Sequence, residues 1–383
     1  MYIYIFMKTG DDAEKCGCTM SDGQPQYKRV IDYILSEISE GRLKQGDRIP
    51  SEKKLSEQFS MSRQTIRHAT GELEKKGVIT RVRGSGSYIG GDASKLRDKF
   101  MTVAVMLTYV DNYIFPQTVR GISDTLEENG YSMQLSFTDN DIEKEQTFLK
   151  KIIAEDNVDA LLAEPSKSSL PNPNMKYYRI IQQRGIPIEF INSSYPKLDI
   201  PCVRLDDEKI GYEAVRYLIE NGHRQIAGIF HCEDSQGLRR FAGYDRALRE
   251  ADIVPDPKKV LWLDTDGIAD VAPLTDYILS RIKGATAIFT YNDEVGCQLI
   301  DGFAERGINV PDDISVISVD DSDLASKVRP GLTTFPHPKR ELGITATNKL
   351  LAMIDNPIVG GNELMMPDLV VRDSVKLLTE KTD

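Results

Sequence analysis

The sequence is poor in cysteine, and the cysteines that it has form no recognisable pattern. The five are scattered along the chain, at Cys16, Cys18, Cys202, Cys232 and Cys297. An odd, dispersed set without a CxxC pair predicts neither a disulfide framework nor a structural zinc site. It favours a reducing, cytoplasmic location.

Long hydrophobic runs and catalytic signatures are also absent. The apolar opening from Met1 to Met7 ends at Lys8 and the acidic residues that follow. This is too short for a signal-peptide core or a membrane-spanning helix. No GxSxG, HExxH or Walker loop is present, and nothing assigns a nucleophile. We therefore expect no membrane association, no metal or other cofactor, and no enzymatic activity.

Positive charge is scarce overall, since the chain has 48 Lys and Arg against 59 Asp and Glu and a net charge of -11. Its distribution is uneven. Residues 25–91 contain 13 Lys and Arg against 8 Asp and Glu, a net charge of +5, and residues 1–24 carry -2, which leaves -14 for residues 92–383. A small basic module ahead of a large acidic one predicts a phosphate-binding head on a body that repels nucleic acid.

Residues 25–91 show the pattern of a small helical domain that ends in a hairpin. The expected elements are, in order, helices over residues 27–41, 51–59 and 62–76 and strands over residues 80–83 and 87–89. Ser51 and Ser62 are expected N-caps, and the loop Gly84-Ser85-Gly86 joins the strands. This is the order of a winged helix-turn-helix. Residues 1–24 are expected to be a disordered leader and residues 92–101 a polar linker.

The third helix has an apolar and a polar face. Ile66, Ala69 and Leu73 share one side at 100° per residue, whereas Gln64 and Arg67 point the other way. Arg can bridge O6 and N7 of guanine and Gln can bridge N6 and N7 of adenine, so the polar face is suited to base edges. Any three-helix unit with a solvated charged face shares this pattern, and the pattern alone leaves that plainer interpretation open.

The segment resembles the GntR-type winged helix. The motifs that carry the resemblance are Gly46-Asp47-Arg48-Ile49-Pro50-Ser51-Glu52, Ser62-Arg63-Gln64-Thr65-Ile66-Arg67 and Gly84-Ser85-Gly86-Ser87-Tyr88. The resemblance implies that double-stranded operator DNA is approached by Arg48, Ser51, Glu52, Ser62, Arg63, Gln64, Thr65, Arg67, Gly84 and Gly86. Beside the glycine loop, Arg83 is expected to face outward, where an arginine fits a minor groove.

From residue 102 onward, buried strands alternate with helical stretches. The expected strands are 102–107, 133–137, 160–163, 188–191 and 203–205, and then 226–230, 260–263, 287–290 and 315–319. This alternation predicts parallel sheets with helices on both faces. Gly121 and Gly243 recur in the first helix of each set and indicate two similar lobes. The expected fold is α/β, with a winged helix-turn-helix ahead of a two-lobed domain over residues 102–383.

Ligands of open parallel sheets bind beyond the carboxyl ends of the strands. The loops at those ends combine aromatic rings with carboxylates, amides and an arginine, which are side chains typical of a sugar-binding site. Each such residue taken singly is as readily structural as ligand-binding, and their shared position at strand ends favours a site.

Residues 102–375 resemble the sugar-responsive core of LacI/GalR repressors, which is similar to periplasmic sugar-binding proteins. The motifs that carry this resemblance are residues 221–227, 240–244, 291–294, 310–317 and 332–335. The winged head replaces the usual LacI-type helix-turn-helix and hinge helix. This combination, together with the segments at 113–116, 164–168, 234–237 and 337–339, is similar to the arabinose repressor (AraR) family.

The resemblance implies L-arabinose as the effector and operator DNA and a second copy of the chain as partners. The effector residues that it implies are Tyr109, Phe115, Glu164, Asn192, Arg240, Tyr291, Asp320 and His337. Dimerisation is expected through the helices after Pro116 and after Glu294.

Two kinds of alternative stay open. Val319 stands where relatives often have Tyr, so another pentose or a nucleoside could be the effector of the same repressor architecture. A sugar sensor that does not bind DNA and a sugar-modifying enzyme are alternatives from other classes. The basic head and the lack of a signal sequence argue against the sensor, and the missing catalytic motifs argue against the enzyme.

Overall fold

The computed structural model describes residues 26–39, 42–44, 46–75, 77–82, 85–90, 99–109, 113–355 and 361–378. The chain forms two compact units, Met1–Leu96 and Arg97–Asp383, which we call the head and the body. The predicted leader, residues 1–24, lies outside the described residues, as do residues 92–98 of the predicted linker.

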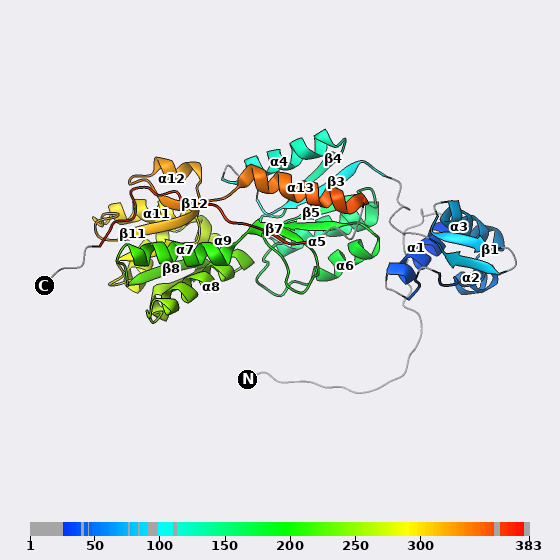
Figure 1. The fold of residues 1–383 in the computed structure, drawn as a ribbon, viewed down its shortest axis with the longest axis horizontal. Helices are drawn as coiled ribbons and strands as arrows, with labels where there is room; N and C mark the ends of the chain where they lie inside the picture. The colour runs from blue at the N-terminus through cyan, green and yellow to red at the C-terminus, as the bar shows by residue number, and fades with distance from the viewer. Residues whose placement is uncertain are drawn as a thin grey trace, which may run out of the picture. The chain divides into compact units, whose positions relative to one another are not determined.

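The head consists of three helices and a hairpin (Figure 1). Its elements are α1 (Gln26–Ser39), α2 (Glu52–Phe59), α3 (Arg63–Lys75), β1 (Ile79–Val82) and β2 (Gly86–Ile89). The strands pair antiparallel, with Arg81 opposite Ser87. Val30, Ile34, Leu55, Ile66 and Leu73 are fully buried and form one core between the helices. The predicted winged helix-turn-helix is therefore confirmed.

The first lobe of the body, called the N-lobe, is built on a six-stranded parallel sheet with the order β13-β7-β6-β5-β3-β4. Its strands are β3 (Thr102–Leu107), β4 (Ser132–Phe137), β5 (Ala160–Ala163), β6 (Ile188–Ile191), β7 (Cys202–Leu205) and β13 (Glu363–Met365). Its helices are α4 (Phe115–Glu128), α5 (Ile142–Glu155), α6 (Met175–Gln183) and α13 (Lys339–Asp355). Alternate residues of β3 enter two different cores: Val103 and Val105 face α4 and α13, whereas Ala104 and Met106 face α5 and α6.

The second lobe, called the C-lobe, has a five-stranded parallel sheet with the order β12-β11-β10-β8-β9. Its strands are β8 (Ile226–His231), β9 (Val260–Leu263), β10 (Ala287–Thr290), β11 (Ser315–Asp320) and β12 (Thr333–Pro336). Its helices are α7 (Asp207–Glu220), α8 (Ser235–Glu250), α9 (Thr265–Ala269), α10 (Thr275–Arg281), α11 (Asp293–Ala304) and α12 (Asp323–Lys327), with 3-10 turns at Pro257–Lys259 and Ala272–Leu274.

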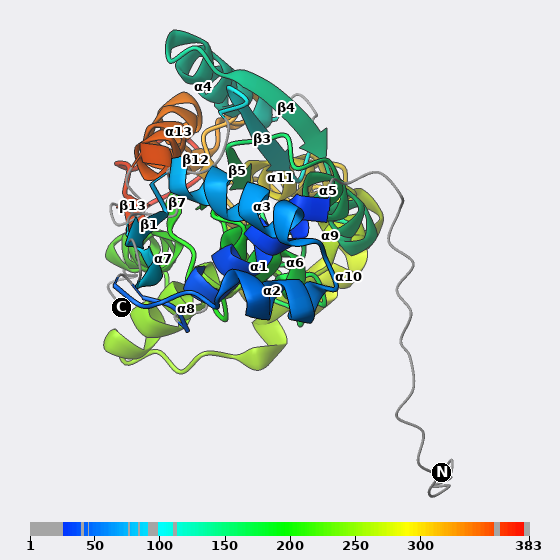
Figure 2. The ribbon, with the colours of Figure 1, turned by 90° about the vertical axis from the view of Figure 1, so that its right-hand side faces the viewer.

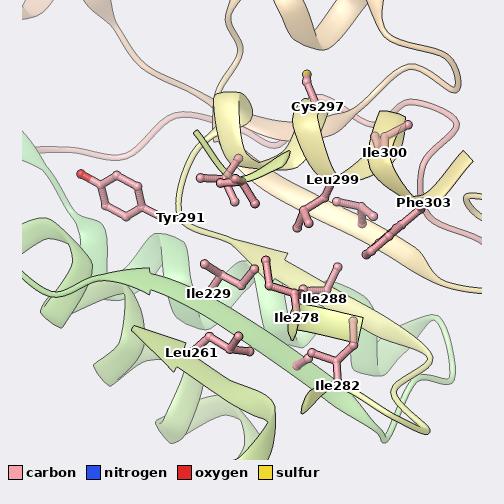
Figure 3. Packing of buried hydrophobic residues seen from close by; sticks show 14 of the residues in the cluster. Ile229, Leu261, Ile278, Ile282, Ile288, Tyr291, Cys297, Leu299, Ile300 and Phe303 are labelled. Carbon is pink, nitrogen blue, oxygen red and sulfur yellow. The ribbon is translucent and has the colours of Figure 1, made fainter. Parts of the chain in front are cut away.

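One face of the C-lobe sheet packs on α10 and α11 (Figure 3). Ile229, Leu261 and Ile288 project from three neighbouring strands toward Leu299 and Phe303 of α11. A sheet that is buried on both faces requires near-continuous apolar strands, which is what made these strands recognisable in the sequence.

The chain crosses between the lobes more often than the two successive sets of strands suggested. It enters the C-lobe after β7, returns to the N-lobe between β12 and α13, and comes back after β13, where Val370 bridges Thr334. The edge strands β12 and β13 were not predicted. They are only four and three residues long, so local periodicity does not reveal them, and β13 also pairs with a strand, β7, that lies far away in sequence.

Each lobe contains a very close contact between two helices. An added Cβ at Gly121 of α4 would lie 2.3 Å from the carbonyl oxygen of Arg340 in α13, and one at Gly243 of α8 would lie 1.9 Å from that of Glu208 in α7. Figures 1 and 2 both show α13 beside α4. The glycines that recur in the sequence therefore mark the equivalent helix pair of each lobe. None of the described helices is long and apolar enough to cross a membrane.

Candidate functional site

In the head, the predicted capping residues lie at the starts of the two helices of the helix-turn-helix. The Ser51 hydroxyl accepts a hydrogen bond from the Lys54 amide at 3.3 Å, and that of Ser62 accepts one from the Thr65 amide at 3.1 Å. These caps leave other first-turn N–H groups of α2 and α3 to outside acceptors, which is the arrangement that binds phosphate.

The two faces of α3 have the predicted character. Ile66, Ala69 and Leu73 are fully buried, whereas Arg63, Gln64 and Arg67 are exposed. The exposed side therefore carries donors and acceptors of the kind that read base edges.

Arg48 lies against the wing of the head. Gly86 has a φ of +130°, and an added Cβ there would come within 2.7 Å of Arg48 Nε. Only glycine lets the guanidinium approach the hairpin this closely. Arg83 and Gly84, both predicted to approach DNA, lie outside the described residues.

Glu52 takes part in ion pairs with two arginines. Its Oε2 accepts a hydrogen bond from Arg67 Nε at 3.0 Å, and its Oε1 lies 3.6 Å from a terminal nitrogen of Arg81. The predicted DNA-facing residues Glu52 and Arg67 are therefore in direct contact.

In the body, a group of buried and half-buried polar residues lies where the carboxyl ends of the two sheets meet. We call it the inter-lobe cluster, and its members are Thr108, Tyr113, Glu164, Asn192, Asp207, Asp234, Arg240, Tyr291, Asp293, Asp320 and His337. It contains six of the eight predicted effector residues.

A chain of hydrogen bonds runs from Glu164 to His337. Glu164 accepts from the Thr108 amide at 2.9 Å and from Asn192 Nδ2 at 2.9 Å. The remaining amide oxygen of Asn192 lies 3.1 Å from His337 Nε2. Since Asn192 already donates to Glu164, its oxygen accepts from His337, which leaves Nδ1 of His337 as an acceptor. This buried Nδ1 has no hydrogen-bond partner among the described residues.

Arg240 forms the other half of the cluster. Its Nε donates to Asp207 at 3.0 Å, a terminal nitrogen lies 3.9 Å from Asp320, and the other terminal nitrogen donates to the Tyr291 carbonyl. Its guanidinium also lies 4.9 Å from the centre of the Tyr291 ring. Burial alone would lower the pKa of Arg240, but the Asp207 and Asp320 carboxylates raise it, so the side chain stays charged.

Burial sets the protonation of the other members. It lowers the pKa of His337 to about 3, and the nearby Arg240 and Lys339 add to this, so the imidazole is neutral near pH 7. Burial raises the pKa of Asp320 to about 6 against the opposing charge of Arg240. It raises that of Asp293 to about 7, with a further contribution from Asp320.

Two predicted effector residues adopt backbone conformations that L-amino acids rarely take. Asn192 has a φ of +62° and Asp320 a φ of +116°. Such conformations persist only where the surrounding structure imposes them, and they are concentrated at functional sites.

Tyr109 and Phe115 form an aromatic pair at the start of α4, with ring centres 5.7 Å apart. The sequence reasoning missed Tyr113 and Asp234. The Tyr113 hydroxyl donates to Asp320 at 2.6 Å and accepts from the Asp293 amide at 3.2 Å, which links the two lobes. Asp234 accepts from the Tyr291 hydroxyl and pairs with His231 at 2.8 Å. Both lie in strand-end loops that were singled out, but only their partners distinguish them from their neighbours.

A second contact between the lobes surrounds a small pocket of about 220 Å³. Its lining residues are Asp139, Asn140, Asp141, Lys167, Glu233, Asp264, Thr265 and Asp266. Lys167 pairs with Glu233 across the lobes at 2.7 Å, and Asn140 donates to Thr265 at 2.8 Å. In the part of the chain that the structure describes, no group of His, Cys, Asp and Glu is arranged to hold a metal ion.

Family models match both units of the chain. Residues 26–89 match bacterial regulatory proteins of the gntR family, and residues 215–375 match the periplasmic binding protein-like domain. Both matches agree with the resemblances seen in the sequence.

Two curated relatives cover nearly the whole chain. The chain is 37% identical to the arabinose metabolism transcriptional repressor of Geobacillus stearothermophilus, over 92% of this chain and 98% of that protein. It is 34% identical to the protein of the same name from Halalkalibacterium halodurans, over 92% and 96%.

A LacI family transcriptional regulator from Enterococcus faecium, solved with bound ribose, has a similar fold. It superposes with a TM-score of 0.62 at 26% identity and covers 73% of this chain and 100% of its own. The predicted LacI-type fold of the body is therefore confirmed.

Proposed function

The chain belongs to the family of arabinose metabolism transcriptional repressors, and from this membership we propose that it holds operator DNA as a homodimer and is released by L-arabinose. Its relatives are repressors, which confirms the prediction that the chain is not an enzyme. The family also makes it a DNA-binding regulator with a small-molecule effector.

The inter-lobe cluster carries the effector proposal. Its carboxylates, among them Glu164, Asp207 and Asp320, outnumber its one arginine, Arg240, which two of them already pair. A phosphorylated or carboxylated ligand would meet net negative charge there, so the site favours a neutral molecule. The unpartnered Nδ1 of His337 adds a buried acceptor suited to a hydroxyl donor.

We propose that the effector is bound by Tyr109, Phe115, Glu164, Asn192, Arg240, Tyr291, Asp320 and His337. In this assignment Glu164 orients Asn192, Asn192 orients His337, and His337 accepts a sugar hydroxyl. The names of the two curated relatives favour L-arabinose, and the bound ribose of the Enterococcus regulator supports a pentose.

The head is the proposed DNA-binding unit. The exposed Arg63, Gln64 and Arg67 would face the base edges, while Arg48 and the capped starts of α2 and α3 would contact phosphates. Its net charge of +5 over residues 25–91 supports this role. We further propose that the body dimerises through α4 and α11, which would place two heads on a palindromic operator.

The effector proposal is tested by calorimetric titration of the full chain with L-arabinose, D-ribose and adenosine. We expect saturable 1:1 binding of L-arabinose that is tighter than binding of either competitor. Preferential binding of D-ribose or adenosine would reassign the effector while keeping the architecture. Absence of binding by all three would overturn the small-sugar assignment.

A further inference from the structure

Glu52 places a carboxylate on the surface of the head that is proposed to approach DNA, where negative charge does not favour binding. Glu52 is the first residue of α2 and follows the Ser51 cap directly. Phosphate contacts dominate the affinity of DNA-binding proteins, and a carboxylate at that surface repels phosphate. The partners of Glu52 suggest a role other than direct contact with DNA.

The first partner is Arg67 on the exposed face of α3. Arg67 uses Nε to donate to Glu52 Oε2 at 3.0 Å, although its side chain is 69% exposed. With Nε held, the two terminal amino groups remain as a pair for an outside acceptor. A guanidinium in this state presents the two parallel N–H donors that match O6 and N7 of guanine.

The second partner is Arg81 on β1, which ties the hairpin to the helices. Its terminal nitrogen lies 3.6 Å from Glu52 Oε1 and donates to Thr70 of α3 at 3.3 Å, while its Nε lies 3.6 Å from Glu74. One carboxylate therefore connects α2, α3 and β1.

We propose that Glu52 is a positioning residue that sets the sequence specificity of the head, because it holds Arg67 in the orientation that reads guanine and keeps it off the phosphates. The proposal rests on the DNA-binding function proposed above. The charge of Glu52 thereby lowers the affinity for non-specific DNA, while its contact with Arg67 increases the discrimination between sequences.

Removal of the charge should change the two kinds of DNA binding in opposite directions. Glu52→Gln removes one negative charge, so affinity for non-specific duplex should rise. The amide oxygen of glutamine is an uncharged and weaker acceptor, so Arg67 is held less firmly in its orientation and operator affinity should fall. A bidentate arginine–guanine pair discriminates by about 1 to 3 kcal/mol, so the ratio of operator to non-specific affinity should drop about 5- to 150-fold.

Glu57→Gln is the matched control. Glu57 lies on the same helix and carries the same charge, but its ion pair, at 4.0 Å, is with Lys53. It should raise affinity for both DNAs to a similar extent and leave their ratio within about twofold.

The probe is the duplex sequence that the wild-type full chain enriches from a randomised library, with a shuffled duplex as the non-specific competitor. Affinities are measured for the wild type, the Glu52→Gln and Arg67→Ala variants, and the double variant. If Glu52 acts through Arg67, Glu52→Gln should cause no further loss of specificity in the Arg67→Ala background.

The outcomes separate this inference from the function on which it rests. If the wild type enriches no sequence, the proposed operator-binding function is overturned, and the role of Glu52 with it. If the wild type enriches a sequence, but Glu52→Gln has the same ratio of operator to non-specific affinity as the Glu57→Gln control, only the positioning role is overturned. The same holds if the losses of Glu52→Gln and Arg67→Ala are additive.

Discussion

At the scale of single residues, the body depends on buried polar groups whose charge is fixed by their neighbours. Arg240 stays ionised because Asp207 and Asp320 face it, and His337 stays neutral because it is buried beside Arg240 and Lys339. A buried charge without a partner costs much free energy, whereas a buried neutral acceptor without a partner costs less. Within the proposed site, Arg240 is therefore already paired before the effector binds, whereas Nδ1 of His337 has no partner among the described residues.

His337 gives the most direct residue-scale test of the effector site. Phenylalanine keeps the ring but removes the acceptor, so His337→Phe should weaken L-arabinose binding by roughly 2- to 12-fold, the range expected for one hydrogen bond. Operator affinity without sugar should stay unchanged. His337→Gln, which retains an acceptor, should keep more of the sugar affinity. Calorimetry with equal affinities for all three proteins would contradict this assignment.

Glu189 of β6 predicts a pH-dependent stability. It is fully buried, and neither of its carboxylate oxygens has a partner among the described residues. Burial raises its pKa from 4.5 to about 8, with Lys349 opposing and Glu363 reinforcing the change. Between these two values the folded chain binds more protons than the unfolded chain, so the free energy of unfolding falls as pH rises.

The Glu189→Gln variant should lose this dependence. A difference of one unit in pKa is worth about 1.4 kcal/mol. Relative to their difference at pH 4.5, the free energy of unfolding of the variant should therefore exceed that of the wild type by on the order of 2 to 4 kcal/mol at pH 9. Urea unfolding of both proteins across this range measures the difference. Parallel curves would show that folding does not change the pKa of Glu189.

At the scale of secondary-structure elements, the two lobes share one mode of helix–helix packing. In each lobe a helix that follows the first strand lies against a helix that enters from a lobe crossing, and a glycine permits the contact. Gly121 and Gly243 were noticed in the sequence as a recurrence. Their reason could not be predicted, because α13, the partner of α4, lies more than two hundred residues away in the chain.

The glycine contact predicts opposite effects for one substitution at two sites. Gly243→Ala would place a methyl group 1.9 Å from a backbone oxygen of α7, and we expect a loss of roughly 1 to 3 kcal/mol from overpacking. Gly71 of α3 has no heavy atom within 4 Å of its added Cβ, so Gly71→Ala should stabilise the head by about 1 kcal/mol. Denaturant unfolding of both variants checks the signs, and equal signs would contradict the packing account.

Local sequence patterns predicted most helices and strands because their periodicities are set by immediate neighbours. The same patterns could not predict β12 and β13, which are only four and three residues long. The pairing partner of β13, β7, also lies far away in the chain. The site shows the same division. Arg240 and Asp320 were identified at strand ends and by resemblance, whereas the roles of Tyr113 and Asp234 follow from side-chain contacts that span the lobes or several loops.

At the scale of the whole molecule, the proposed regulation of the basic head depends on how the two lobes of the acidic body are arranged. The lobes are linked by Tyr113 to Asp320, His337 to Asn192 and Lys167 to Glu233. All three contacts lie at the carboxyl ends of the two sheets, so a sugar bound there would alter the equilibrium between lobe arrangements. An effector can do this only to the extent that its affinity differs between the two states.

The central claim is that L-arabinose weakens the hold of the full chain on operator DNA. The direct measurement is the operator dissociation constant without sugar and with saturating L-arabinose. Typical couplings of about 1 to 3 kcal/mol predict a 5- to 150-fold increase. An unchanged dissociation constant at a sugar concentration that saturates the protein would contradict the account.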